Sequence, residues 1–271
     1  MSEVKNNTGK YFDKHTAESG HWYSQEGEPM YTIVGANGKE RPTTLADARK
    51  LNLVPSVTGI MGVAHKPALE RWKITQAIES AILTEMDVDE TIEEYVGRVR
   101  EHSQIVGRLS ADRGSEIHHK IEEGFQSGKP SDSYLAIREW LDEHYPNEEW
   151  IAEDSFCAKE GYGGKIDLYS KNGIFIDFKT KDGLQGKDPK RLVFDEHGMQ
   201  LSAYAQGCGF DKAKRVSIFV DRKETGLIAC HQWDEASHSK HIDMFNALLT
   251  YWKLTKNYDP SEVGKLWMNQ K

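Results

Sequence analysis

Two carboxylates and a lysine lie close together in the middle of this sequence. Asp167 and Asp177 are ten residues apart, and Lys179 follows two positions after the second acid. Asn172 and Gly173, between the acids, are typical of the turn of a β-hairpin. Hard divalent cations prefer carboxylate oxygens, and a lysine can stabilise the negative charge that develops on a reacting phosphate. The pattern therefore indicates metal-dependent hydrolysis of a phosphodiester bond.

Whether the two acids share one face depends on the register of this hairpin. A two-residue turn would pair Asp167 with Phe178 and would place the acids on opposite faces of the sheet. A three-residue turn, ending in a left-handed bulge residue, pairs Ser170 with Ile174 and therefore Asp167 with Asp177. Two carboxylates opposed in this way repel each other by about 0.2 to 1 kcal/mol. A divalent cation between them would remove that repulsion.

The side-chain pattern favours the three-residue turn. In that register one face is apolar and consists of Ile166, Leu168, Ile174, Ile176 and Phe178, with Ser170 at its end. The other face carries charged and aromatic side chains, namely Lys165, Asp167, Tyr169, Phe175, Asp177 and Lys179. We expect the first to be a core face and the second to be open to solvent. Lys179 would then lie beside the acids, within reach of the scissile phosphate or the attacking water.

The spacing around the hairpin resembles a known nuclease motif. Gly164-x-x-Asp167, followed by Asp177-x-Lys179, is similar to the motif of the PD-(D/E)xK nuclease superfamily and, within it, of the RecB-like exonuclease branch. The resemblance covers residues 109 to 220 and implies an αβββαβ core. The sequence around residues 54 to 58 is also similar to the N-terminal part of phage-encoded members.

Three further segments resemble the same branch, in the same order along the chain. Gly114-x-x-x-His118 is similar to a helix whose histidine is a metal ligand, and Glu153 lies where the family often has a carboxylate on its first core strand. Gln200-x-x-x-Tyr204 resembles a helix that follows the hairpin in these nucleases. The resemblance implies that His118 binds the metal together with the two aspartates, and that Glu153 assists.

The helix phase favours His118 over its neighbour His119 as the ligand. Ile117, Ile121 and Phe125 form an apolar stripe, and His118 borders this stripe. A neutral imidazole at the rim of the core could bind a metal through one ring nitrogen. Successive helical residues point about 100° apart, so His119 is expected to point toward solvent.

Two assignments stay open from the sequence. Glu153 and Asp154 alternate on the expected strand, and neither of its faces is cleanly apolar, so strand parity does not decide between them. Gln200 and Tyr204 are one helical turn apart and share a face. They could hydrogen-bond to a nucleotide or brace the site.

A basic segment follows the hairpin. Residues 180 to 191 read as a long loop without apolar periodicity, and its cationic residues are Lys181, Lys187, Lys190 and Arg191. Loops of this length are often functional or disordered. We expect this loop to close on the phosphate backbone of a nucleic acid.

Composition constrains the class of protein more than its chemistry. The net charge of −8 argues against nonspecific coating of nucleic acid, but not against a nuclease, whose metal site is itself acidic. Cys157, Cys208 and Cys230 indicate no disulfide framework and cannot supply the four-cysteine iron-sulfur cluster of some RecB-like nucleases. No apolar run approaches the length of a membrane span and the N-terminus is polar, so we expect a cytoplasmic protein.

The expected fold is α/β, with a mixed sheet flanked by helices. The expected elements are a β region at 22–42 with a turn at Asn37-Gly38, helices at 67–85, 89–108, 110–126 and 134–143, strands at 150–159, 164–170 and 174–179, a helix at 194–208, strands at 215–221 and 227–232, and a helix at 236–254. Residues 1–108 are expected to form an N-terminal β-hairpin and helical elaboration packed on the core. Residues 109–271 are expected to form the nuclease core with its C-terminal helix.

Motif and resemblance together predict a Mg²⁺- or Mn²⁺-dependent deoxyribonuclease, an exonuclease in replication, recombination or repair. The expected partners are DNA and a single-strand-binding or recombination protein, without a membrane. The alternative is a noncatalytic nucleic-acid-binding or recombination accessory protein that keeps the fold. The intact set of two aspartates and a lysine disfavours this alternative.

Overall fold

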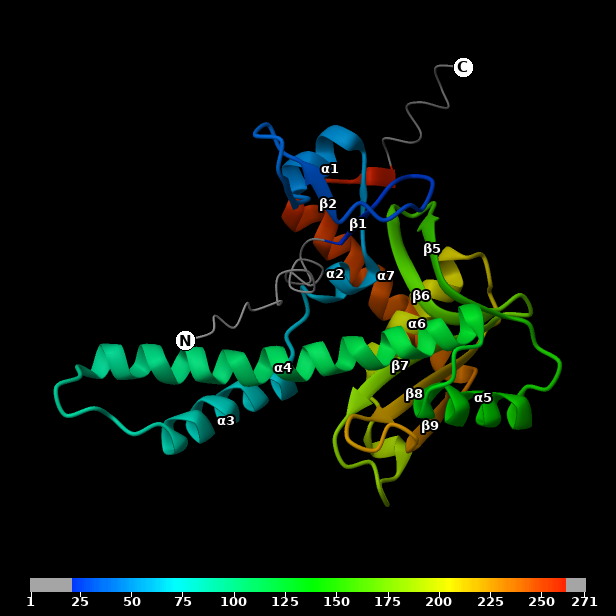
Figure 1. Cartoon of the computed structure of the whole chain (residues 1–271). Helices are drawn as coiled ribbons and strands as arrows, with labels where there is room; N and C mark the ends of the chain where they lie inside the picture. Colours follow the sequence, from blue (N-terminus) through cyan, green and yellow to red (C-terminus); the bar gives the residue numbers. More distant parts are fainter. Residues whose placement is uncertain (1–20, 262–271) are drawn as a thin grey trace.

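A computed structural model describes residues 21–261 of the chain. Its centre is a mixed five-stranded sheet with the order β5-β6-β7-β8-β9, in which only β7 and β8 run parallel (Figure 1). The strands are β5 (Trp150–Ala158), β6 (Tyr162–Ser170), β7 (Ile174–Lys181), β8 (Lys214–Asp221) and β9 (Ile228–Trp233). The expectation of an α/β fold with a mixed sheet flanked by helices is confirmed.

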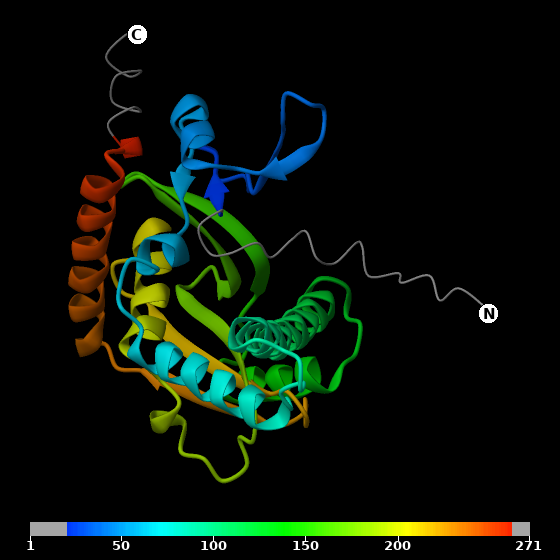
Figure 2. The same ribbon diagram turned by 90° about the vertical axis from the view of Figure 1, so that its left-hand side faces the viewer.

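Helices cover both faces of the sheet. On one face lie α4 (Ile92–Ser127) and α5 (Asp132–His144), and on the other lie α6 (Asp195–Gly207) and α7 (Ala236–Lys256). Figure 2, in which α4 is seen end-on, shows α6 and α7 away from it on the opposite side. The expectation that one face of the hairpin is open to solvent is therefore wrong. Phe175, placed on that face, is fully buried in the cluster formed with α6 and α7.

The N-terminal part packs on the first strands of the sheet. Its elements are β1 (Trp22–Tyr23), β2 (Thr32–Val34), β3 (Glu40–Pro42), α1 (Leu45–Leu51), β4 (Val54–Pro55) and α2 (Val57–Met61). The expected turn at Asn37-Gly38 is confirmed, because β2 and β3 pair across it and Gly38 has a φ of 73°. β1 pairs with β4, and a bridge from Ser56 to Gly163 joins this part to β6.

A single helix replaces two expected ones. α4 begins after a capping box formed by Thr91 and Glu94, runs for 36 residues and ends at Gly128, which is left-handed with a φ of 73°. The expected break between 108 and 110 is absent because nothing there ends a helix. Ser110 is a possible N-cap, but no proline precedes it, and Gly107 alone weakens a helix by only about 1 kcal/mol. The expected division between residues 108 and 109 falls inside α4.

The first half of α4 forms a helical hairpin with α3 (Pro67–Leu83), and this hairpin projects from the body of the molecule (Figure 1). A short 3₁₀ helix, η2 (Pro189–Arg191), lies in the connection between β7 and α6. None of the helices within residues 21–261 is both long enough and apolar enough to cross a membrane.

Candidate active site

The hairpin has the three-residue turn that the side-chain pattern favours. Ser170 pairs with Ile174, and Leu168 pairs with Ile176. Gly173 closes the turn with a φ of 84°, a left-handed conformation that glycine adopts without strain, and its N–H donates to the Ser170 carbonyl at 3.0 Å. The predicted register is confirmed over these residues.

The ladder between β6 and β7 ends just before the two acids. Asp167 and Asp177 would be its next pair, but instead Asp167 Oδ2 accepts a hydrogen bond from the backbone N–H of Phe178 at 2.8 Å. The expected directly opposed pair is therefore corrected. The acids border the place where the two strands separate, and the Asp167 side chain reaches across this opening to the β7 backbone.

β5 is irregular at the same level of the sheet. Its pairing with β6 omits the pair of Glu153 and Asp167, between Ala152 and Asp154, and Glu153 has a φ of 60°. A left-handed residue inside a strand interrupts the regular alternation of side chains. Beyond this point Ile166 is buried in the cluster with α6 and α7, whereas Leu168 is buried in the cluster with α4 and α5. The expectation that both residues share one core face is wrong.

Asp177 is the most deeply buried acid of the site. Its side chain is 1% exposed, and its Oδ1 accepts from Lys179 Nζ at 2.7 Å and from Gln200 Nε2 at 2.9 Å. Its Oδ2 is also buried but has no hydrogen-bond partner within the described residues. Burial, partly opposed by Lys179, raises the pKa of the Asp177 carboxyl to about 6. Because buried polar atoms are almost always paired and residues 21–261 supply no partner for this oxygen, a cation or a water molecule would fit beside it.

Lys179 stands between this acid and the solvent. Its side chain is 29% exposed, and Nζ also lies 3.2 Å from Gln200 Oε1. Burial acts to lower the pKa of Lys179, but the Asp177 and Asp167 charges outweigh burial and raise it above its ordinary value. The side chain is therefore a fixed cation at the rim of the site.

The second half of α4 brings His118 to the hairpin. Its Nδ1 lies 3.9 Å from Asp167 Oδ2, and its ring is edge-on to Phe178. Burial and the Lys179 charge lower the pKa of His118, which favours the neutral imidazole that a metal ligand requires. His119 is 60% exposed and lies beside acids of its own helix. The predicted difference in orientation between the two histidines is confirmed.

A glycine allows this approach of α4 to β7. A Cβ atom at Gly114 would lie only 2.9 Å from Thr180 Oγ1. The glycine of the G-x-x-x-H segment is thus a point of close contact, one helical turn before His118. It fixes the distance at which the histidine meets the hairpin.

Glu153 and Asp154 have different surroundings in the structure. Glu153 forms an ion pair with Lys165 and is 15% exposed, and burial raises its pKa although Lys165 opposes this. The Asp167 charge also acts on Glu153, so the two carboxyls are close. Asp154 instead accepts from the Tyr169 hydroxyl at an exposed position. Sequence reasoning gave no role to Lys165, although its position two residues before Asp167 could have suggested one.

Gln200 and Tyr204 brace the site from α6. Gln200 is 8% exposed and Tyr204 is 5% exposed, and Gln200 Nε2 donates to the Tyr204 hydroxyl at 2.9 Å. Gly164 gives the tyrosine room, because a Cβ atom there would lie 2.8 Å from Tyr204 Cε1. Of the two roles left open by the sequence, these contacts match bracing. Neither side chain offers much surface to a nucleic acid.

The basic residues after the hairpin divide into two groups. Lys181 ends β7, and its Nζ donates to the Leu192 carbonyl at 3.1 Å and lies over the ring of Phe194. Three others are exposed on the connection to α6, namely Lys187, Lys190 and Arg191. This connection is anchored by Leu184 and Leu192, which are buried against Phe219. Within residues 21–261 no hydrogen bond or ion pair links the three exposed cations to the two aspartates.

The donors at this site fit a divalent cation in type. They are carboxylates and an imidazole held neutral, with one buried carboxylate oxygen left unpaired. No group of three or more His, Cys, Asp or Glu side chains in the described part of the chain converges closely enough to hold an ion. Mg²⁺ keeps several waters and is often held by one or two carboxylates, so two aspartates meet its minimum.

Comparisons with known proteins add little to these observations. No protein-family profile and no curated protein sequence matches the chain. Similar solved structures include SSO0001, with 18% identity and a TM-score of 0.29 over 68% of this chain and 87% of that one. They also include an alkaline exonuclease (LHK-Exo) from Laribacter hongkongensis, with 14% identity and a TM-score of 0.36 over 73% of this chain and 99% of that one. Likeness at this level carries no argument about fold or function, which must rest on the residues of this chain.

Proposed function

We propose that the protein is a metal-dependent deoxyribonuclease of the RecB-like PD-(D/E)xK type that acts as an exonuclease. The observation that carries the proposal is the carboxylate of Asp177, which is buried beside a lysine cation and has one oxygen that no group within residues 21–261 hydrogen-bonds. The large majority of buried side-chain polar atoms have a hydrogen-bond partner. A divalent cation bound at this oxygen would be its missing partner.

In this proposal Asp167, Asp177 and His118 hold Mg²⁺ or Mn²⁺, and Glu153 assists from β5. A divalent cation bound there would make a water molecule more acidic and would withdraw charge from the phosphate. The hydrogen bond from the Phe178 N–H holds the Asp167 carboxylate at the opening between β6 and β7. The imidazole of His118 needs no deprotonation before binding, because burial already favours its neutral form.

Lys179 supplies the fixed positive charge. Its pKa is raised by the two aspartates, so the ammonium stays protonated and can stabilise the negative charge on the phosphate oxygens in the transition state. Gln200 holds Lys179 beside Asp177 through both atoms of its side-chain amide. Its Oε1 lies near Lys179 Nζ, and its Nε2 donates to Asp177. Tyr204 fixes the amide orientation by accepting from Gln200.

Substrate contact outside the site is assigned to the exposed cations after β7. Lys187, Lys190 and Arg191 would contact the phosphate backbone of DNA, whereas Lys181 supports the loop from below. Phosphate contacts of this kind add affinity without sequence preference and weaken with salt. We further expect a cytoplasmic location, and a single-strand-binding or recombination protein as a partner.

One observation favours the alternative, a noncatalytic nucleic-acid-binding or recombination accessory protein. In the described residues no three ligands converge on one point, as they would in a preformed metal site. A protein that kept the fold without the chemistry would need no such convergence. The two proposals differ in whether DNA is consumed.

The test is digestion of end-labelled single- and double-stranded DNA with Mg²⁺, with Mn²⁺ or with EDTA. The control is Asp177→Asn, purified in the same way, which keeps the size of the side chain but removes its charge. We expect metal-dependent digestion by the wild type and none by the variant. Binding without digestion in every metal condition would support the accessory protein.

A further inference from the structure

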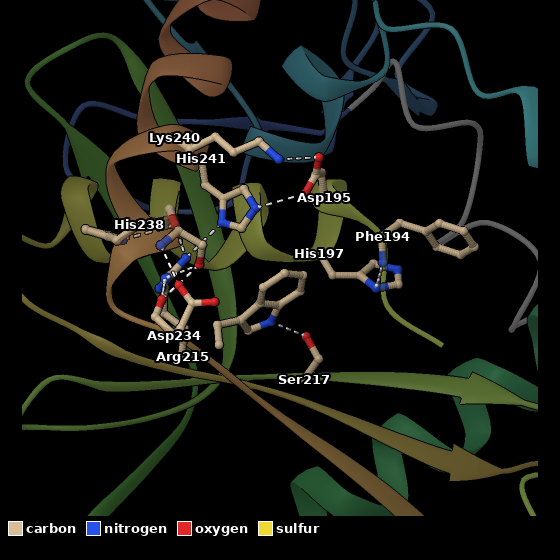
Figure 3. Close-up of polar contacts among 12 residues, drawn as sticks. Phe194, Asp195, His197, Arg215, Ser217, Asp234, His238, Lys240 and His241 are labelled. Atoms are coloured by element: carbon tan, nitrogen blue, oxygen red, sulfur yellow. Dashed lines mark hydrogen bonds and ion pairs between the residues drawn. The ribbon is translucent and has the colours of Figure 1, made fainter. Parts of the chain in front are cut away.

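Arg215, on β8, is the largest side chain of the described residues that is fully buried. Its Nη1 donates to Ser202 Oγ at 2.7 Å and lies 3.0 Å from His241 Nδ1, while Nη2 donates to the Asp234 carbonyl at 2.7 Å and to Ser237 Oγ at 3.0 Å (Figure 3). A guanidinium has no acceptor, so Nδ1 of the histidine accepts and the ring is neutral. Nε of Arg215 has no hydrogen-bond partner within the described residues.

None of these four acceptors carries a negative charge. The carboxylate of Asp234 acts on Arg215 through its charge, but the hydrogen bonds of this buried cation go to neutral acceptors. Burial, partly opposed by the Asp234 charge, lowers the pKa of Arg215 to about 10. Movement of any acceptor would leave a charged donor unpaired in the interior. The hydrogen bonds of Arg215 therefore favour one relative position of the groups that surround it.

These groups fix α6 against α7. Ser202 lies in the middle of α6, and His241 lies on α7. A Cβ atom at Gly198 would be 2.3 Å from the His241 ring, so the two helices touch at this point. His241 Nε2 also lies 3.3 Å from Asp195 Oδ1, in the first turn of α6. The helix is held at its start and at its middle.

The opposite face of the same helix braces the proposed active site. Gln200 precedes Ser202 by two residues, which places the two side chains about 200° apart around the helix. While Ser202 accepts from Arg215, Gln200 reaches Lys179 and Asp177. α6 thus connects the buried cation to the candidate site.

We propose that Arg215 is a positioning residue: its hydrogen bonds to Ser202 and His241 fix α6 and so hold Gln200 where its amide group bridges Lys179 and Asp177. The inference rests on the proposed nuclease function, since it names a residue that supports that site. Within residues 21–261 no hydrogen bond or ion pair joins Arg215 to Asp167, Asp177 or Lys179, so its proposed effect on the site passes through Gln200.

A double-mutant cycle of Arg215→Met and Gln200→Ala tests the proposal. Each single change should lower kcat for DNA digestion by about tenfold with KM within about twofold, and the double variant should be no slower than Gln200→Ala alone. Arg215→Lys should recover part of the rate, because it keeps the charge and some of the hydrogen bonds. If kcat of the double variant falls by the product of the two single decreases, the proposal is overturned.

Two further variants serve as a substitute and as a control in this test. If Arg215→Met does not fold, Ser202→Ala replaces it in the cycle, because it removes only one hydroxyl from the same hydrogen-bond group. Lys240→Ala is the matched control. Its Nζ lies 2.8 Å from Asp195, but the side chain is 59% exposed and makes no contact with Arg215 within the described residues, so kcat should not change.

A second readout needs no DNA. Amide hydrogen exchange in residues 200–204 should be about tenfold faster in Ser202→Ala than in the wild type or in Lys240→Ala. Unchanged exchange in Ser202→Ala would overturn the positioning role. A wild type that digests no DNA would overturn the proposed function instead, and the exchange result would still decide whether Arg215 fixes the helix.

Discussion

The unpaired Oδ2 of Asp177 is the residue-level feature on which the account depends. The sequence placed this acid on a solvent-open face, yet α6 covers that face and the side chain is 1% exposed. The spacing of Asp167, Asp177 and Lys179 identified this residue, because the register of a hairpin is determined by residues close together in the sequence. Its burial depends on α6, which begins 18 residues later in the chain at Asp195, and no local sequence pattern predicts that burial.

The same burial predicts a pH dependence of stability. The pKa of Asp177 is about 6 in the folded protein against an ordinary 3.8, so folding favours the protonated acid. The resulting stability is fully present below about pH 4 and is lost as the pH rises through about 6. In metal-free urea unfolding, the free energy of the wild type relative to Asp177→Asn should fall across this range.

Addition of Mn²⁺ at pH 7 should then raise the unfolding free energy of the wild type but not that of Asp177→Asn. A difference between the two proteins that stays the same from pH 4 to pH 7 would contradict the burial of this acid. Equal stabilisation of both by the metal would place the ion elsewhere.

The two adjacent histidines of α4 give a second residue-level prediction. His118 lies 3.9 Å from Asp167, whereas His119 points away from the hairpin. His118→Ala should raise the metal concentration that half-saturates digestion, and His119→Ala should leave it unchanged. The measurement is a metal titration of the digestion rate. Equal behaviour of the two variants would show that α4 does not supply a ligand.

At the level of elements, local signals predicted most of what the structure shows. The turns at Asn37-Gly38 and Asn172-Gly173 were found because their residues favour one backbone conformation. The separation of β6 from β7 was not found, because the hairpin residues alone give no sign of it. At the same level of the sheet Glu153, on a third strand, has a left-handed conformation. α4 was predicted as two helices, at 89–108 and 110–126, although nothing between them ends a helix.

Two glycines of α4 should respond in opposite ways to the same change. At Gly107 a Cβ atom would meet only Trp72, at an ordinary 3.6 Å, so Gly107→Ala should stabilise the protein by up to about 1 kcal/mol. At Gly114 it would lie 2.9 Å from Thr180, so Gly114→Ala should destabilise by about 1 to 3 kcal/mol and shift His118. Urea unfolding of both variants checks this. Stabilisation by both would mean that α4 does not lie close on β7.

At the scale of the whole molecule, the N-terminal part and the candidate site share one core. Trp22, Val57 and Ile60 are buried in the same cluster as Tyr204 and Phe245. The sequence predicted an elaboration packed on a core, but it could not show that the two parts have apolar residues in common. Arg215 was missed for a similar reason, because its partners come from α6 and α7, which only the tertiary fold brings together.

A fragment that begins at residue 109 should therefore not fold. It would lose the first half of α4 and would expose the apolar residues that Trp22, Val57 and Ile60 cover. Amide dispersion in a proton–nitrogen NMR spectrum checks this, with the full chain as control. A well-dispersed spectrum from the fragment would show that residues 109–271 form an independent domain.

The central claim is that two acids and Lys179 hydrolyse DNA with a divalent cation. Its most direct test is the single-turnover rate of digestion with Mn²⁺ for the wild type, Lys179→Ala and Lys187→Ala. Lys179→Ala should be slower by about 10² to 10³-fold at saturating DNA, because it removes the charge beside Asp177. Lys187→Ala, which removes an equal charge from the exposed loop, should keep the wild-type rate at saturation. A Lys179→Ala rate within a few-fold of the wild type would contradict the account.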